Sequence, residues 1–218
     1  MTVHPFVMPE PFDRPEGLIE TMRWEGTIRL LNFHLARLGT SAQSFGFPFD
    51  RERVERALAV RTRRLKGIHR VRLELSCTGH VRCRVTPLED DKPVYRVTFA
   101  RERVDPSDPF LYHKTTRRVL YERAYLAGRA QGFDEVLLCN EAGAVTEGTR
   151  TNLFVERDGT LYTPPVEVGL LPGVFRAYML TSRTDVVERV LYPEDVVTAD
   201  RVYVCNALRG MKAVELVA

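Results

Sequence analysis

The first hundred residues contain short stretches in which hydrophobic and polar side chains alternate. Such alternation is typical of strands that bury one face and expose the other. It predicts strands at residues 17–24, 27–30, 71–75, 81–85 and 94–99. The third and fourth strands meet at Thr78-Gly79-His80 as a hairpin with one polar face. We expect the fifth strand to continue the same sheet.

Leucines at helical spacing separate these strands. Leu31, Leu35 and Leu38 predict a helix that runs through Ser44. Asp50 is the expected N-cap of a second helix that runs through Lys66. The strands and the two helices together predict a small α/β domain.

Residues 105–109, Asp-Pro-Ser-Asp-Pro, are rich in residues that interrupt regular structure. We therefore expect a small N-terminal domain at 1–104, a linker at 105–112 and a second domain at 113–218. The second domain is predicted to begin with a helix from Thr115 to Ala130. Its other expected elements are strands at 135–139, 151–155, 161–163 and 202–205 and a helix that begins after Gly173 and runs to about Ser182.

Composition places the chain among ordinary globular proteins. It has 218 residues, 44% hydrophobic and 28% charged, with a formal net charge of +3. The four cysteines form no CxxC pair, which favours a reducing compartment over disulfides or a zinc site. Cys139 and Cys205 lie in apolar runs, so we expect them to be buried thiols.

The N-terminal sequence Met-Thr-Val-His-Pro has no basic or apolar leader, and no apolar run reaches membrane-spanning length. We expect a cytoplasmic protein without membrane contact. The five histidines show no HxH or HExxH spacing, which argues against a metal site. The basic stretch from Arg61 to Arg72 leaves a non-catalytic basic binding protein as a remote alternative. It lacks interleaved aromatic residues, which favours a solvated helix face over nucleic-acid binding.

Three short motifs in the second half carry the candidate chemistry. Lys114 lies in Tyr-His-Lys-Thr-Thr-Arg-Arg, where two arginines and the predicted helix start would favour its neutral amine. Glu147 follows 33 residues later in Glu-Gly-Thr-Arg-Thr-Asn-Leu-Phe, and Leu-Pro-Gly-Val occupies residues 171–174. Taken alone, the local sequence favours a solvated surface lysine. The combination resembles the fold-type IV branch of pyridoxal-phosphate (PLP) enzymes, which includes branched-chain and D-amino-acid aminotransferases and aminodeoxychorismate lyases.

The resemblance implies an α+β fold with two domains, like that of D-amino-acid aminotransferase, and a homodimer. It implies PLP as the cofactor and Lys114 as the residue that binds it covalently and moves the substrate proton. Glu147 would be the carboxylate that keeps the pyridine nitrogen protonated. Arg37, in His-Leu-Ala-Arg-Leu, would supply a cation to the phosphate.

The phosphate would also use backbone groups at residues 171–175 and 206–208. Phe175 and Ala207 stand where the family often has hydroxyl side chains, so we expect greater reliance on backbone groups and arginine. The full set of expected cofactor contacts is Arg37, Lys114, Glu147, Gly148, Thr149, Leu171, Gly173, Val174, Phe175, Asn206, Ala207 and Leu208.

Two details favour the lyase branch of this family. Branched-chain aminotransferases carry a tyrosine five residues beyond the lysine, where this chain has Val119, and Cys205-Asn206-Ala207-Leu208 resembles the lyases. We therefore expect an aminodeoxychorismate lyase, which makes 4-aminobenzoate for folate synthesis and releases pyruvate. A class IV aminotransferase acting on branched-chain or D-amino acids remains the alternative. The substrate has two carboxylates, and the candidates to contact it are Arg23, Arg101, Arg103 and His113.

Overall fold

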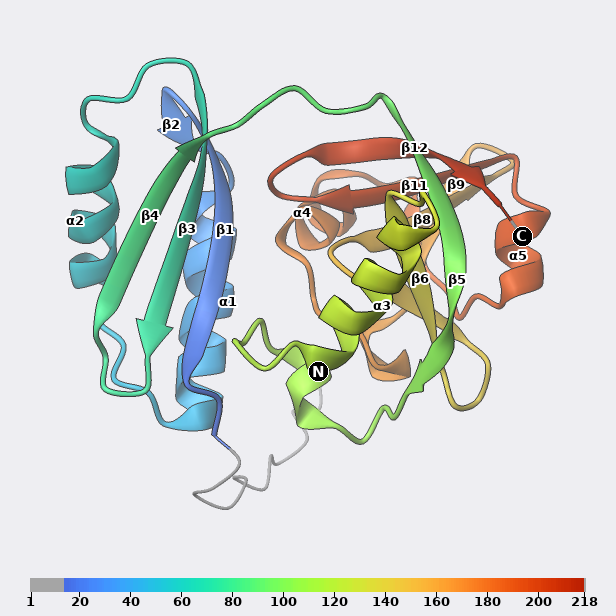
Figure 1. The fold of residues 1–218 in the computed structure, drawn as a ribbon, viewed down its shortest axis with the longest axis horizontal. Helices are drawn as coiled ribbons and strands as arrows, with labels where there is room; N and C mark the ends of the chain where they lie inside the picture. The colour runs from blue at the N-terminus through green and yellow to red at the C-terminus, as the bar shows by residue number, and fades with distance from the viewer. Residues whose placement is uncertain (1–13, 218) are drawn as a thin grey trace. The chain divides into compact units, whose positions relative to one another are not determined.

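The structure is a computed structural model that describes residues 14–217. The expected absence of a leader at Met1–Pro5 therefore lies outside the described residues. The chain forms two compact units (Figure 1). The first contains the residues up to Leu88 together with Lys114–Arg117, and the second contains Glu89–His113 and the residues from Arg118 onwards. The division thus differs from the one expected at 105–112, because the chain leaves the first unit after Leu88.

The first unit is a four-stranded antiparallel sheet with the order β2-β1-β3-β4 and two helices (Figure 1). Its elements are β1 (Gly17–Glu25), β2 (Thr27–Ile28), α1 (Leu31–Phe45), α2 (Arg51–Thr62), β3 (Ile68–Ser76) and β4 (Val81–Pro87). The buried residues alternate along β1 from Leu18 to Trp24, with Ile19 also buried, and along β3 from Val71 to Leu75. This alternation confirms that one face of the sheet carries the core.

Both helices of the first unit begin close to the predicted positions. The Asp50 side chain accepts a hydrogen bond from the Arg53 N–H, which confirms the predicted N-cap of α2. The helix ends at Thr62, before the expected Lys66. The basic stretch after Arg61 is therefore not one helix face as expected, because Arg70 and Arg72 belong to strand β3.

The second unit contains an eight-stranded mixed sheet with the order β10-β9-β8-β11-β12-β5-β6-β7. Its strands are β5 (Val94–Val104), β6 (Glu135–Asn140), β7 (Val145–Gly148), β8 (Asn152–Arg157), β9 (Thr160–Thr163), β10 (Val186–Glu188), β11 (Arg201–Asn206) and β12 (Gly210–Leu216). Its helices are α3 (Val119–Ala130), α4 (Val174–Ser182) and α5 (Pro193–Val197), with short 3-10 turns at Pro109–Tyr112 and Val166–Val168.

Strand β5 corrects one expectation. It was predicted to continue the sheet of the hairpin, but it pairs in parallel with β6 and β12 of the second unit. The reason is long-range pairing: Val97 lies opposite Glu135 on one side and Leu216 on the other. The core of this unit gathers around Val97, Leu137 and Leu153, which are fully buried.

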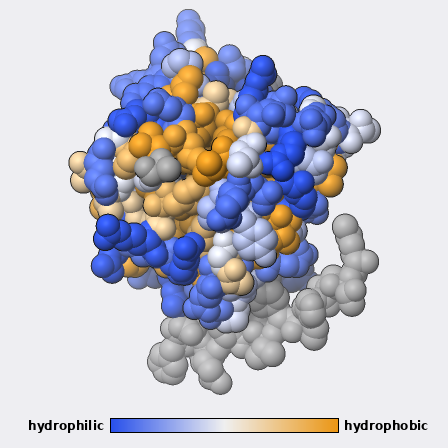
Figure 2. Space-filling model, turned by 90° about the vertical axis from the view of Figure 1, so that its right-hand side faces the viewer, coloured by the Kyte–Doolittle hydropathy of each residue, from blue (hydrophilic) through white to orange (hydrophobic). Residues whose placement is uncertain are grey.

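The four cysteines are free, and Cys139 and Cys205 are buried as predicted. Over residues 14–217, no helix is both long enough and apolar enough to cross a membrane. One face of the second unit carries a group of hydrophobic residues surrounded by hydrophilic ones (Figure 2). Such a patch is typical of a surface that another molecule covers. The expected homodimer stays a prediction.

Candidate active site

Lys114 is placed by backbone pairing with the beginning of β1. The Ile19 N–H donates to the Lys114 carbonyl at 2.7 Å, and the Thr116 N–H donates to the Gly17 carbonyl at 2.9 Å. Between these bonds Thr115 lies opposite Leu18 as an antiparallel bridge. The lysine therefore lies beside an isolated β-bridge at the edge of β1.

This pairing corrects the expected environment of Lys114. The helix predicted from Thr115 begins at Val119, because the preceding backbone is already hydrogen-bonded to β1. The positive end of a helix dipole therefore does not start at the lysine, since that effect is confined to the first turn. Arg118 is directed elsewhere: its Nη2 donates to the Thr149 carbonyl at 2.6 Å, and its guanidinium lies over the Tyr121 ring.

Glu147 is a buried carboxylate, 5% exposed, near the end of β7. Its Oε1 accepts from the Tyr121 hydroxyl at 2.8 Å and from the Leu171 N–H at 3.2 Å. Its Oε2 accepts from the Asn152 Nδ2 at 3.3 Å. Burial raises the pKa of Tyr121 well above its usual value, and the charge of Glu147 adds to the effect. Tyr121 therefore stays protonated and donates to the carboxylate.

Asn152 connects Glu147 to the turn before α4. Its Nδ2 also donates to the Leu171 carbonyl at 2.9 Å. A Cβ on Gly173 would lie 1.7 Å from the Asn152 Oδ1, so only glycine fits there. Gly173 is the N-cap of α4 and provides no side-chain hydrogen bond to the first turn. The N–H groups that begin a helix are suited to bind an anion.

The side chains that follow this turn serve the protein core. Phe175 packs against the cluster around Phe154. Arg176 is 3% exposed, and its Nη2 donates to the Pro164 carbonyl at 2.7 Å and pairs with Glu188. Arg176 therefore acts as a structural residue of the second unit, and the turn offers backbone groups as the ligands for an anion.

Asn206 ends β11, and Ala207 and Leu208 follow it in the turn before β12. The Asn206 Oδ1 accepts from the Leu208 N–H at 3.1 Å and from the Arg209 N–H at 2.8 Å. Its Nδ2 donates to the Arg150 carbonyl at 3.2 Å. The loop is thereby fixed to the residues that follow Glu147. The Leu208 N–H thus closes the turn, and the expected contact of Leu208 with the cofactor stays a prediction.

Glu135 is a site residue that no sequence motif indicated. This carboxylate at the start of β6 is 2% exposed. It accepts from the N–H groups of Thr149 at 2.9 Å and Arg150 at 3.0 Å, and from the hydroxyls of Thr149 and Thr151. These bonds fix the turn directly after Glu147. In the sequence, Glu135 could have been recognised as a carboxylate that begins an otherwise apolar strand.

Replacement of Glu135 by alanine is expected to destabilise the protein by about 3–5 kcal/mol, because several buried donors lose their acceptor. Urea unfolding of the two proteins measures the difference. Glu141→Ala, which removes an exposed carboxylate from the next loop, is the matched control and should change stability by less than about 0.5 kcal/mol. A loss below about 1 kcal/mol for Glu135→Ala would show that the turn is held by other contacts.

Arg37 lies on α1 and contacts a buried carboxylate of β1. Its Nε donates to the Glu20 Oε1 at 2.9 Å, and its Nη2 pairs with the Glu20 Oε2 at 2.6 Å. The His34 Nδ1 lies 2.6 Å from the same Oε2. Burial acts to raise the pKa of Glu20, but Arg37 and His34 outweigh it and lower that pKa to about 2. This arrangement fixes the direction of the Arg37 guanidinium.

The low pKa of Glu20 predicts acid sensitivity. A carboxyl whose pKa is about 2 when folded and near 4.5 when unfolded stabilises the protein above pH 4.5. That contribution, about 3 kcal/mol, is lost as the pH falls from about 4.5 towards 2. Unfolding by urea at several pH values should show this loss in the wild type. In Glu20→Gln the same pH range should produce a smaller change, and an equal change would contradict the assignment.

The other candidate residues divide between the two units. Arg23, in the first unit, pairs with Glu25 at 3.1 Å. Arg101 and Arg103 are exposed on β5 of the second unit. His113 is 7% exposed, and burial lowers its pKa to about 4, so it is neutral near pH 7. Within the second unit, the structure brings Glu147–Thr149 together with the turn at 171–173 and connects the loop at 206–208 to them.

Comparison with known proteins shows one family across nearly the whole chain. The family described as amino-transferase class IV matches residues 17–217. A candidate aminodeoxychorismate lyase of Schizosaccharomyces pombe is 32% identical over 169 residues, which cover 75% of this chain and 73% of that protein.

Two solved structures are similar to this fold. A candidate amino-acid aminotransferase from Mesorhizobium loti has a TM-score of 0.88 and 38% identity, and the match covers 92% of this chain and 99% of that one. A candidate 4-amino-4-deoxychorismate lyase from Legionella pneumophila has a TM-score of 0.83 and 25% identity, over 98% of this chain and 87% of that one.

Proposed function

Because this chain belongs to the class IV aminotransferase family, we propose that it is a PLP-dependent 4-amino-4-deoxychorismate lyase. The observation that carries the proposal is the buried Glu147 carboxylate, whose hydrogen bonds also hold the turn before α4. A carboxylate and a helix start joined in this way suit a ligand with a cationic ring nitrogen at one end and a phosphate at the other.

The residues present fit the chemistry of PLP. Glu147 would accept a hydrogen bond from the protonated pyridine nitrogen. The N–H groups that begin α4 and the Arg37 guanidinium would hold the phosphate, and Lys114 would bind the aldehyde carbon. Bound PLP supplies an electron sink for the electron pair left when a proton leaves the carbon next to the substrate nitrogen. Glu147 supports that role by keeping the ring nitrogen protonated in a buried environment.

In the proposed reaction Lys114 acts as the base. Its amine takes the proton from C4 of aminodeoxychorismate, the carbon that bears the amino group. The bond from C3 to the enolpyruvyl oxygen then breaks, and the ring becomes aromatic as 4-aminobenzoate. The leaving enolpyruvate takes up a proton and becomes pyruvate. The half-buried backbone segment from Lys114 to Thr116 keeps the base in place through its two hydrogen bonds to β1.

The lyase is favoured over an aminotransferase by two observations. This chain has Val119, which is 78% exposed, at the position where branched-chain aminotransferases of the family have a tyrosine. The S. pombe relative at 32% identity is a candidate aminodeoxychorismate lyase. The alternative, transfer of an amino group between an amino acid and a keto acid, is supported by the M. loti structure at 38% identity.

One pair of assays distinguishes the two reactions. The purified protein with PLP is given freshly prepared aminodeoxychorismate, and 4-aminobenzoate and pyruvate are measured. In parallel it is given branched-chain or D-amino acids with 2-oxoglutarate, and glutamate is measured. Equal amounts of 4-aminobenzoate and pyruvate support the lyase. Glutamate formation without 4-aminobenzoate would replace the lyase with the aminotransferase.

A further inference from the structure

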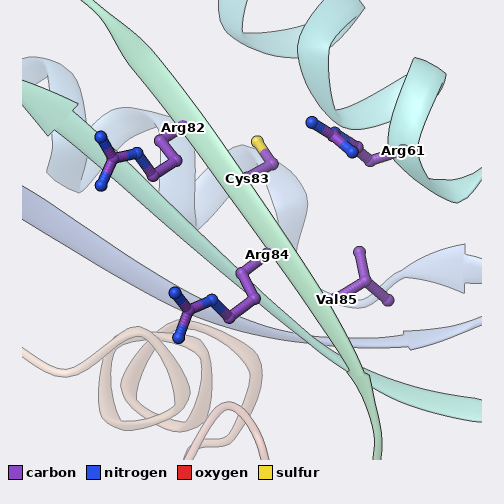
Figure 3. Close-up of a pocket in the computed structure, with 5 residues that line it drawn as sticks. All are labelled: Arg61, Arg82, Cys83, Arg84 and Val85. Carbon is purple, nitrogen blue, oxygen red and sulfur yellow. The ribbon is translucent and has the colours of Figure 1, made fainter.

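Glu20 faces the helix side of the first sheet. It lies opposite Leu73 of β3, and Leu73 lies opposite Cys83 of β4. Directly paired residues of neighbouring strands point to the same face of a sheet. Figure 3 shows Cys83 pointing towards Arg61 of α2. The Glu20 carboxylate is therefore directed into the layer between the sheet and its helices, where the residue is 2% exposed.

His34 contacts this carboxylate from α1, one turn before Arg37 and on the same face of the helix. The His34 Nδ1 lies 2.6 Å from the Glu20 Oε2, which also accepts from the Arg37 Nη2 at 2.6 Å. The imidazole is 1% exposed. Within residues 14–217 its Nε2 has no hydrogen-bond partner, so the contact with Glu20 is the one hydrogen bond of this buried ring.

The ionised state of Glu20 determines where His34 carries a proton. Burial acts to raise the pKa of Glu20, but the neighbouring Arg37 and His34 lower it to about 2. At neutral pH the carboxylate therefore only accepts hydrogen bonds, and the His34 Nδ1 must be the donor. Charge-assisted hydrogen bonds from both residues then hold the carboxylate in one orientation.

The same pairing sets the direction of the Arg37 guanidinium. A guanidinium is planar, and its five N–H donors form a rigid fork. Glu20 accepts from the Nε and Nη2 groups, so the edge that contains Nη1 is directed away from the carboxylate. An arginine binds a phosphate most specifically through two parallel hydrogen bonds, which requires a fixed direction of the fork.

We propose that His34 is a positioning residue for the cofactor: it holds Glu20, and Glu20 directs the Arg37 guanidinium at the phosphate of PLP. The inference rests on the proposed function, in which Arg37 binds that phosphate. His34 acts through the other two residues and needs no contact of its own with PLP. Loss of its donor leaves Arg37 its charge but loosens its direction, so affinity falls for the phosphate and not for the rest of the ligand.

The test compares PLP with pyridoxal, which has the same ring and aldehyde but no phosphate. Each is titrated into the cofactor-free protein, and the absorbance change gives an apparent Kd. His34→Leu should raise the Kd of PLP by at least about fivefold and leave that of pyridoxal within about twofold. His34→Phe, which keeps a ring without a donor, should behave in the same way. His34→Asn, whose amide places an N–H close to the position of Nδ1, should restore most of the affinity for PLP.

A double variant shows whether His34 acts through Arg37. Arg37→Gln should raise the Kd of PLP by at least about tenfold. Adding His34→Leu to it should change that Kd by less than about twofold, because no guanidinium remains to be directed. Arg61→Gln is the matched control. It removes the same charge from a pocket of about 360 Å³ lined by α2 and β4 (Figure 3), and it should leave the Kd of PLP within about twofold.

Three results would overturn the inference: unchanged PLP affinity in His34→Leu and His34→Phe, equal losses for PLP and pyridoxal, or a full further loss in the double variant. Weaker PLP binding in Arg61→Gln would assign the phosphate to the other pocket and overturn it too. A protein that binds PLP as expected but forms no 4-aminobenzoate contradicts the lyase reaction and leaves the positioning role standing. Formation of 4-aminobenzoate with PLP affinity independent of His34 contradicts the positioning role alone.

Discussion

Lys114→Ala is expected to lose 4-aminobenzoate formation by at least about 10³-fold, because one side chain both attaches the cofactor and moves the substrate proton. Little loss of stability should accompany this change. The contacts that place the residue are made by its backbone carbonyl and by the Thr116 N–H, and alanine retains them.

Two measurements separate attachment from turnover. Borohydride reduction of the PLP-loaded wild type, followed by peptide mass spectrometry, should find the cofactor on the peptide that contains Lys114. The variant should carry none on that peptide. Lys66→Ala, which removes an exposed lysine after α2, should keep both the cofactor and the activity. Cofactor attached to another lysine in the wild type would remove Lys114 from its role.

Glu147→Gln is expected to lower kcat by about 10²-fold or more, because a neutral amide does not hold a proton on the ring nitrogen. It should also lower stability by about 1–3 kcal/mol. The Asn152 Nδ2 donates to the Glu147 Oε2, and a glutamine would place a second amide donor against it. Steady-state kinetics and urea unfolding of the same protein preparations measure the two effects.

Tyr121→Phe is the matched comparison for Glu147. It removes one donor to the carboxylate, at 2.8 Å, while the negative charge remains. We expect a stability loss similar to that of Glu147→Gln but a loss in kcat of less than about tenfold. If the two variants lower kcat equally, the carboxylate acts through the packing of the turn, and its proposed role at the ring nitrogen is wrong.

Elements whose pattern is local could be predicted from the sequence. The alternation in β1, the leucine spacing of α1 and the Asp50 cap each depend on residues close together in the chain. Strands β7, β10 and β12 were not predicted, because two are very short and all three are defined by their partners. The position of β5 between β6 and β12 follows from pairing with residues far along the chain, which alternation does not encode.

The same distinction applies to the site. Lys114 and Glu147 were predicted because they belong to motifs; the structure shows Glu147 in a buried hydrogen-bond network, and the roles of both residues stay predictions. The helix start assigned to Lys114 was wrong, because its neighbours form hydrogen bonds with Gly17 and Ile19 instead. Glu135 was missed since its partners lie at residues 149–151. The contact of His34 with Glu20 was missed because it joins a helix to a strand.

The separation in sequence between β1 and the segment Lys114–Thr116 has a consequence for synthesis on the ribosome. Residues up to Leu88 contain all four strands of the first sheet, so that sheet can form before the segment Lys114–Thr116 emerges from the ribosome. Until then the N–H of Ile19 and the carbonyl of Gly17 are an unpaired strand edge, which can pair with other nascent chains. The segment Lys114–Thr116 covers that edge only late in synthesis, so we expect incomplete chains that end before it to associate more readily than the full chain.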